Sequence, residues 1–253
     1  MNISAMNILI LDLDGTLMPS NAVDNRCYWQ AVRDVFEPDH GRHTNGIPDP
    51  AEFDHVTDSG ILHQWCVSKT GRPPLVSETD AVKHRFLQLL EEAAINEPKS
   101  FVPFDGLHAW LDRCIGDSQT VLAIATGGWR HSARFKLTTA GLGHYQLPLA
   151  SSDELMQRTD IMVAALGQLC ENQHGADPIA SGLESNVTYF GDAPWDYKAC
   201  QTLGWGFVGI ADQKNTESLK LIGAKLIVPD FTLLDGPQLR SENTAEIQAL
   251  IQD

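Results

Sequence analysis

The sequence predicts an α/β protein with a doubly wound parallel sheet and an inserted helical segment. Short apolar runs rich in β-branched residues alternate with longer stretches of helical periodicity, and several of these runs end directly in polar residues. A further observation predicts the insertion, because residues 18–103 carry helical patterns and no convincing strand. We therefore expect a Rossmann-like core, formed by residues 1–17 and 104–253, and a helical cap formed by residues 18–103.

The expected core elements follow one another as strand and helix in regular alternation. The strands span residues 8–11, 121–125, 187–190 and 206–210, with a weaker pattern at 225–228. The helices span residues of about 130–140, 158–173, 195–203 and 214–222. Because strands joined through helices are parallel, we expect helices on both faces of the sheet.

The insertion is expected to contain three helices, near residues 27–37, 51–69 and 78–95. The last has the clearest pattern, since Pro98 follows its end and one face is apolar. That face consists of Val82, Phe86, Leu89, Leu90 and Ala93. An apolar face of this kind must be covered, and we expect the insertion to lie over the carboxyl edge of the sheet as a cap.

Composition excludes several classes of protein. The chain has 253 residues, of which 43% are hydrophobic, so it can bury a substantial core. A formal net charge of −15 argues against nonspecific binding to nucleic acid or to an anionic membrane. The five cysteines are scattered without a CxxC pair, which disfavours a disulfide scaffold or a zinc site. The first apolar run ends at Asp12, too soon for a signal peptide or a membrane span, and we expect a cytoplasmic location.

The first strand runs directly into two carboxylates one residue apart, Asp12 and Asp14. Because side chains alternate along a strand, a regular strand would point both acids the same way and crowd two negative charges. Gly15 then gives the chain freedom to turn, and Thr16 adds a hydroxyl. The acids can simply end the strand or brace the turn, but they also form a candidate site for a hard cation.

A second strand ends in acid, because residues 187–190 lead into Gly191 and Asp192. Pro194 suits the first turn of a helix, so Asp192 can be only its N-cap and Asp196 only a favourable charge at the helix start. Two acidic strand ends in one parallel sheet nevertheless lie along the same edge, where their carboxylates can share a divalent ion.

A third strand end carries hydrogen-bond donors instead of acids. Thr126, Gly127 and Gly128 follow residues 121–125 and precede a helix. The threonine hydroxyl, the exposed amides and the helix N-terminus can hold phosphate oxygens. Glycines at such a position also serve only to reverse the chain, so the turn is informative mainly through its place in the sheet.

Phosphate binding at this edge also requires a cation. Arg158 is the first candidate, because it precedes a predicted helix and can bind phosphate bidentately. Its alternative is an ordinary surface ion pair with Glu154 or Asp160. Lys136 and Arg130 are weaker candidates, since both belong to a helical pattern that can simply expose them.

The ordered series of these residues resembles the motifs of the haloacid dehalogenase-like hydrolase superfamily. The series consists of DLDGTL starting at Asp12, then Thr126, then Arg158, then GDAPWD starting at Gly191. Arginine stands where many relatives carry lysine, and the insertion after the first motif resembles the helical cap of that superfamily.

The resemblance implies a Mg²⁺-dependent phosphatase that acts on a small phosphate ester. Asp12 would attack phosphorus to form an aspartyl-phosphate, and Asp14 would protonate the leaving oxygen and then activate water. Asp12, the backbone carbonyl of Asp14 and Asp192 would hold Mg²⁺, with Asp196 as a direct or indirect partner. The remaining phosphoryl oxygens would be bound by Thr126, Gly127 and Arg158.

Three other functions remain open at this point. A phosphomutase would share the first steps and return the phosphate to a sugar. A 2-haloacid dehalogenase would also use an aspartate nucleophile, but the dehalogenases of the superfamily generally lack the second acid, which here is Asp14. A noncatalytic relative would bind a metal or a partner without turnover.

Overall fold

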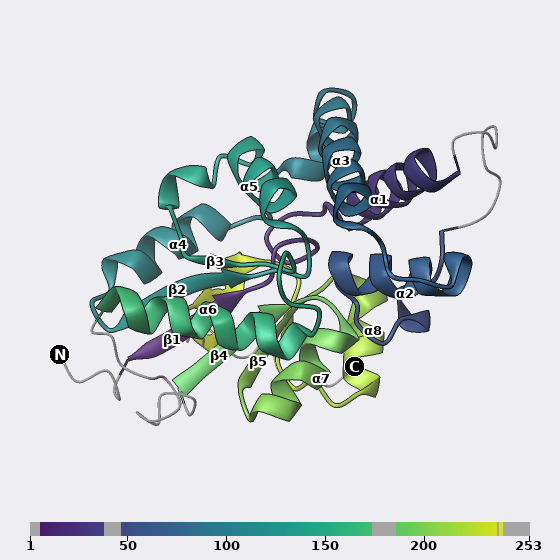
Figure 1. The fold of residues 1–253 in the computed structure, drawn as a ribbon. Helices are drawn as coiled ribbons and strands as arrows, with labels where there is room; N and C mark the ends of the chain where they lie inside the picture. Colours follow the sequence, from purple (N-terminus) through teal and green to yellow (C-terminus); the bar gives the residue numbers. More distant parts are fainter. Residues whose placement is uncertain (1–5, 38–46, 174–185, 237, 240–253) are drawn as a thin grey trace.

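A computed structural model describes residues 6–37, 47–173, 186–236 and 238–239 of the chain (Figure 1). Residues 240–253 of the predicted core therefore lie outside the described residues. Among the helices of the described part, none is long and apolar enough to cross a membrane.

The predicted parallel sheet is confirmed. It has six strands in the order β3-β2-β1-β4-β5-β6, and every neighbouring pair is parallel. The strands are β1 (Asn7–Leu11), β2 (Thr120–Ala125), β3 (Leu149–Ala150), β4 (Val187–Gly191), β5 (Gly206–Ile210) and β6 (Ile227–Val228). The weak pattern at 225–228 forms only the two residues of β6, and β3 was not predicted, because two residues carry no periodicity.

Helices cover both faces of this sheet, as expected (Figure 1). They are α4 (Leu107–Gly116), α5 (Arg130–Thr139), α6 (Arg158–Gln173), α7 (Pro194–Leu203) and α8 (Gln213–Leu221). A small antiparallel pair, β7 (Leu234–Asp235) and β8 (Gln238–Leu239), follows the sheet. Short 3₁₀ turns span Gly143–Tyr145 and Phe231–Leu233.

The central strand β1 is continuously apolar from Ile8 to Leu11, where all of its residues are buried. Leu9 and Leu11 pack into the hydrophobic cluster that includes α4, whereas Ile8 and Ile10 pack into the cluster formed with α6 and α7. Burial on both faces disfavours polar residues at these positions. Leu11 is in register with Ile124 of β2 and with Phe190 of β4, so the polar residues after all three strands reach the same edge.

The insertion between β1 and α4 is helical where the structure describes it. Its helices are α1 (Asn21–Phe36), α2 (Asp58–Thr70) and α3 (Val76–Asn96), with 3₁₀ turns at Pro50–Glu52 and Pro98–Phe101. Two predicted starts were wrong: α1 begins at Asn21 instead of residue 27, and α2 begins at Asp58 instead of residue 51. Thr57 sets the second start, because its hydroxyl caps the helix by accepting a hydrogen bond from the Gly60 amide.

The insertion helices lie beyond the carboxyl ends of the central strands, on the right in Figure 1. Two kinds of contact join them to the rest of the chain. Tyr28 of α1 and Phe86 of α3 pack around Trp129, with ring centroids 5.6 and 6.1 Å from its own. At the start of α2, Thr57 Oγ1 donates to the Met156 carbonyl at 2.8 Å, and the Asp58 amide donates to the Gly127 carbonyl at 2.8 Å. These contacts place α1 and α2 against the edge where the polar residues gather.

Candidate active site

Three carboxylates from two neighbouring strand ends meet at this edge. Oxygen atoms of Asp12, Asp192 and Asp196 lie within 4.8 Å of one another, and all three residues are buried. Asp12 follows β1, Asp192 follows β4, and Asp196 lies in the first turn of α7. The structure thus brings together the two acidic junctions, and Asp196 is placed with its carboxylate in the cluster.

Burial and mutual repulsion make this cluster costly when it is charged. Burial is the main cause that raises the pKa of Asp12 to about 7, and the charge of Asp196 adds to it while Arg158 opposes it. Burial, followed by repulsion from Asp196 and Asp12, also raises the pKa of Asp192 well above its ordinary value. An oxygen-only donor set with excess negative charge suits a hard divalent cation such as Mg²⁺, so these residues fit the metal that the motifs imply.

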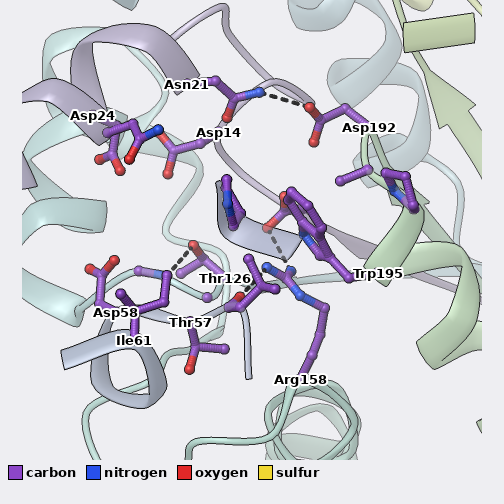
Figure 2. Close-up of a pocket in the computed structure, with 18 of the residues that line it drawn as sticks. Asp14, Asn21, Asp24, Thr57, Asp58, Ile61, Thr126, Arg158, Asp192 and Trp195 are labelled. Atoms are coloured by element: carbon purple, nitrogen blue, oxygen red, sulfur yellow. Dashed lines mark hydrogen bonds and ion pairs between the residues drawn. The ribbon is translucent and has the colours of Figure 1, made fainter. Parts of the chain in front are cut away.

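Gly15 makes the close packing around this cluster possible. Its φ of +77° lies in the left-handed region, and a Cβ at this position would collide with the side chains of Asn21 and Asp192. The space is taken by a hydrogen bond in which Asn21 Nδ2 donates to Asp192 Oδ2 at 2.7 Å (Figure 2). The first residue of α1 therefore orients a carboxylate of the cluster.

Asp14 lies outside the three-carboxylate cluster and has partners of its own. Ser20 Oγ donates to Asp14 Oδ1, and Lys136 Nζ donates to Asp14 Oδ2, both at 2.5 Å. Lys136 also donates to Asp24 Oδ1 at 2.7 Å. The expectation that a helix would expose Lys136 was wrong, because Asp24 of α1 and Asp14 together enclose its fully buried ammonium group.

The TGG turn after β2 is built differently from the expected phosphate cradle. Thr126 is buried, and the three amides of residues 128–130 already have acceptors within the protein. The acceptors are Thr126 Oγ1 for Gly128, Asp58 Oδ2 for Trp129 and Asp153 Oδ2 for Arg130. Side-chain capping has thus used the donors at this helix N-terminus, which leaves Thr126 and the Gly127 segment at the cavity wall.

Arg158, the first residue of α6, reaches the carboxylate cluster. Its Nη1 lies 2.9 Å from Asp196 Oδ1 and 3.4 Å from Asp12 Oδ1, and its side chain is 13% exposed. These pairs replace the surface pairing with Glu154 or Asp160 that was the alternative. Nη2 also donates to the carbonyl of Val56 in the insertion at 3.3 Å. A cation is therefore present beside the acids.

Most of these groups line one cavity of about 600 Å³ (Figure 2), whereas Lys136, Ser20 and Asp196 lie behind its wall. The predicted residues that line it are Asp12, Asp14, Thr126, Gly127, Arg158 and Asp192. The insertion contributes Asn21, Asp24, Asn25, Tyr28, Asp49, Pro50, Val56, Thr57, Asp58 and Ile61. A chamber with acids, a hydroxyl and an arginine at its base and a helical wall opposite can hold a small polar ligand.

Several residues of this site were not assigned from the sequence. Asp24 and Asp58 come from insertion helices and share the surroundings of Lys136, while Tyr189 OH contacts Arg158 Nη1 at 3.3 Å from within β4. No motif marks them, because they meet the other residues only through contacts between distant segments. Asn21 had a weak signal in its position just after the first motif.

The raised pKa of Asp12 leads us to expect that the stability of the fold depends on pH. The raised pKa of Asp12 means that the folded chain holds this proton more tightly than the unfolded chain. Its contribution to stability is therefore present below pH 3.8 and is lost as the pH rises through about 7. In buffer containing a chelator, we expect the melting temperature of Asp12→Asn to exceed that of the unmodified protein by about 5 °C or more at pH 8 and by less at pH 5. Thermal melts at the two pH values measure this, and a variant that melts lower at pH 8 contradicts it.

Solved structures share this architecture at low sequence identity. CbbY from Rhodobacter sphaeroides in complex with xylulose-(1,5)-bisphosphate matches with a TM-score of 0.63 and 15% identity, over 92% of this chain and 100% of that one. A hydrolase from Pseudomonas syringae matches with a TM-score of 0.61 and 19% identity, over 89% and 94%. A HAD (haloacid dehalogenase-like) hydrolase of family IA, variant 3, from Entamoeba histolytica matches with a TM-score of 0.60 and 14% identity, over 98% of this chain and 100% of that one. No protein-family model and no curated protein matches the sequence. The chain therefore has the fold of the haloacid dehalogenase-like hydrolases.

Proposed function

We propose that the protein is a Mg²⁺-dependent phosphomonoester hydrolase that acts on a small phosphorylated metabolite. The observation that carries this proposal is the convergence of Asp12, a threonine hydroxyl and Arg158 on one cavity, next to a carboxylate cluster suited to a divalent cation. A CbbY structure that contains a sugar bisphosphate supports a small phosphate ester as the ligand class.

In this proposal Asp12 is the nucleophile. A carboxylate oxygen of Asp12 forms a bond to phosphorus while the bond from phosphorus to the leaving oxygen breaks. Asp14 gives its proton to that oxygen and then takes a proton from the water that hydrolyses the aspartyl-phosphate. Thr126 Oγ1 and the Arg158 guanidinium bind the other phosphoryl oxygens, where negative charge shifts during the reaction.

The residues that would hold the metal are Asp12, Asp192 and Asp196, together with the backbone carbonyl of Asp14. When bound, Mg²⁺ supplies positive charge that offsets the repulsion between these acids and a phosphate dianion. Within the chain, Arg158 and the Asn21 amide orient the same carboxylates.

Phosphate release from a panel of esters tests the proposal. The protein is treated with chelator, supplied with Mg²⁺, and assayed on p-nitrophenyl phosphate, sugar phosphates, phosphoglycolate and nucleotides, with a 2-haloacid as control. We expect Mg²⁺-dependent release of inorganic phosphate from at least one ester and no halide release. Isomerised sugar phosphate without phosphate release would indicate a mutase, halide release a dehalogenase, and metal binding without any turnover a noncatalytic relative.

A further inference from the structure

The proposed mechanism gives no role to Lys136, although it is the most deeply enclosed cation of the site. Lys136 lies on α5, its side chain is 0% exposed, and its Nζ contacts the carboxylates of Asp14 and Asp24. An ammonium group buried in this way is retained only when carboxylates compensate its charge. The position of the Lys136 ammonium group is therefore fixed by its ion pairs with Asp14 and Asp24.

The contacts of Lys136 fix the orientation of Asp14. One carboxylate oxygen of Asp14 accepts from Lys136 and the other accepts from Ser20 Oγ, so both are bound. In Figure 2, Asp14 lies beside Asp24 and apart from Asp192. Ser20 and Lys136 thus hold the Asp14 carboxylate outside the three-carboxylate cluster, while Asp14 still lines the cavity.

Ser20, which donates to Asp14, and Asp24, which accepts from Lys136, both come from the start of the insertion. Ser20 is the residue directly before α1, and Asp24 lies in its first turn. Asp24 places a second carboxylate on the ammonium group, with Oδ1 at 2.7 Å from Lys136 Nζ, so this lysine is bound between an acid of the core and an acid of the insertion. Burial by itself lowers the pKa of Lys136, but attraction to Asp14 and Asp24 outweighs this effect and raises it, which keeps the lysine charged.

A second lysine, Lys83, also joins the insertion to the core, but through a partly exposed ion pair. Lys83 of α3 pairs with Asp153 at 2.7 Å, and both side chains are about a quarter exposed, at 24% and 26%. This pair joins the same two parts of the chain without contacting Asp14. It provides a matched comparison for the buried lysine.

We propose that Lys136 is a positioning residue which, with Ser20 and the counter-charge of Asp24, holds the Asp14 carboxyl group where it delivers a proton to the leaving oxygen. This proposal rests on the proposed phosphatase function. It assigns to the insertion a part in the proton transfer, because the start of the insertion contributes both Ser20 and Asp24.

The dependence of kcat/KM on the leaving group tests this role. This parameter covers the steps up to departure of the leaving group, so it reports proton delivery and not the later hydrolysis of the aspartyl-phosphate. A p-nitrophenolate leaves without protonation, whereas the alkoxide of glycerol 3-phosphate requires it. We expect Lys136→Met to lower kcat/KM about 100-fold on glycerol 3-phosphate and less than about threefold on p-nitrophenyl phosphate, in line with the usual contribution of general acid catalysis.

Three further variants separate positioning from folding. Lys83→Met is the matched control and is expected to change both substrates equally and by little. Lys136→Met alone leaves the carboxylates of Asp14 and Asp24 without their cation, and adding Asp24→Asn removes one of these two charges. We expect this double variant to show the same selective loss of kcat/KM on glycerol 3-phosphate. Ser20→Ala removes one hydrogen bond to Asp14 and no charge, and we expect the same selectivity at about tenfold on glycerol 3-phosphate.

The outcomes distinguish this inference from the proposed function. An equal loss on both substrates for Lys136→Met and Ser20→Ala, or no loss, overturns the positioning role while the phosphatase function stands. Absence of Mg²⁺-dependent turnover in the unmodified protein overturns the phosphatase function, and the positioning role with it.

Discussion

Replacing Asp12 by asparagine is expected to lower kcat by at least about 10³-fold on every phosphate ester that the protein hydrolyses. The amide cannot form the acyl-phosphate bond, and the neighbouring acids cannot substitute, because Asp192 and Asp196 are anchored by Asn21 and Arg158. The loss should occur without loss of folding, since the substitution preserves side-chain volume and removes a buried charge. Phosphate-release kinetics and thermal melts on the same preparation measure both effects.

Two controls make the Asp12→Asn result specific. Asp80→Asn makes the same chemical change at an exposed position of α3 and should leave turnover unchanged. Rapid quenching of the unmodified protein with substrate should yield an acid-stable, hydroxylamine-sensitive phosphoprotein that Asp12→Asn lacks. Undiminished turnover in Asp12→Asn would exclude this residue as the nucleophile.

Removing divalent cations is the second change with a large expected effect. After chelation we expect phosphate release to fall at least about 100-fold and to return on addition of Mg²⁺, because three buried carboxylates otherwise repel the phosphate dianion. Asp192→Asn should raise the Mg²⁺ concentration needed for half-maximal activity at least about tenfold, since it removes one charged oxygen donor. Titration of activity against Mg²⁺ measures both quantities.

The control for the metal prediction is an exposed acid that does not belong to the cluster of Asp12, Asp192 and Asp196. Asp160 lies exposed in the first turn of α6, two residues after Arg158. Asp160→Asn should leave the Mg²⁺ requirement unchanged. Full activity in excess chelator would contradict the assignment of the cluster as a metal site, whatever the effect of Asp192→Asn.

The sheet could be predicted because its signal is local. Four of its strands are largely apolar runs of five or six residues, because burial on both faces leaves few polar positions in such strands. The helix α4 was missed even though Leu107, Trp110, Leu111 and Cys114 have helical spacing and pack into the core. By contrast, β3 has two residues and exists only because it pairs with β2.

The start of α2 depended on capping that the apolar pattern does not report. At α2 the start is set by the Thr57 hydroxyl, and an apolar pattern that extends further back gives no sign of it. The amides of the TGG turn show the same limit. The sequence indicates free donors there, whereas Asp58 and Asp153 arrive from distant segments and bind two of them.

The sequence by itself determined the parallel α/β core and the chemical character of its carboxyl edge, with acids after two strands and a hydroxyl after a third. Local periodicity and residue type are sufficient for these features, because neighbouring strands in register bring their ends together. Only the tertiary structure decided which groups touch: Lys136 is held by Asp14 and Asp24, and Arg158 reaches Asp196. The physical reason is that the partners of a buried charge are set by the packing of segments distant in sequence. No local sequence pattern encodes the distances between such segments.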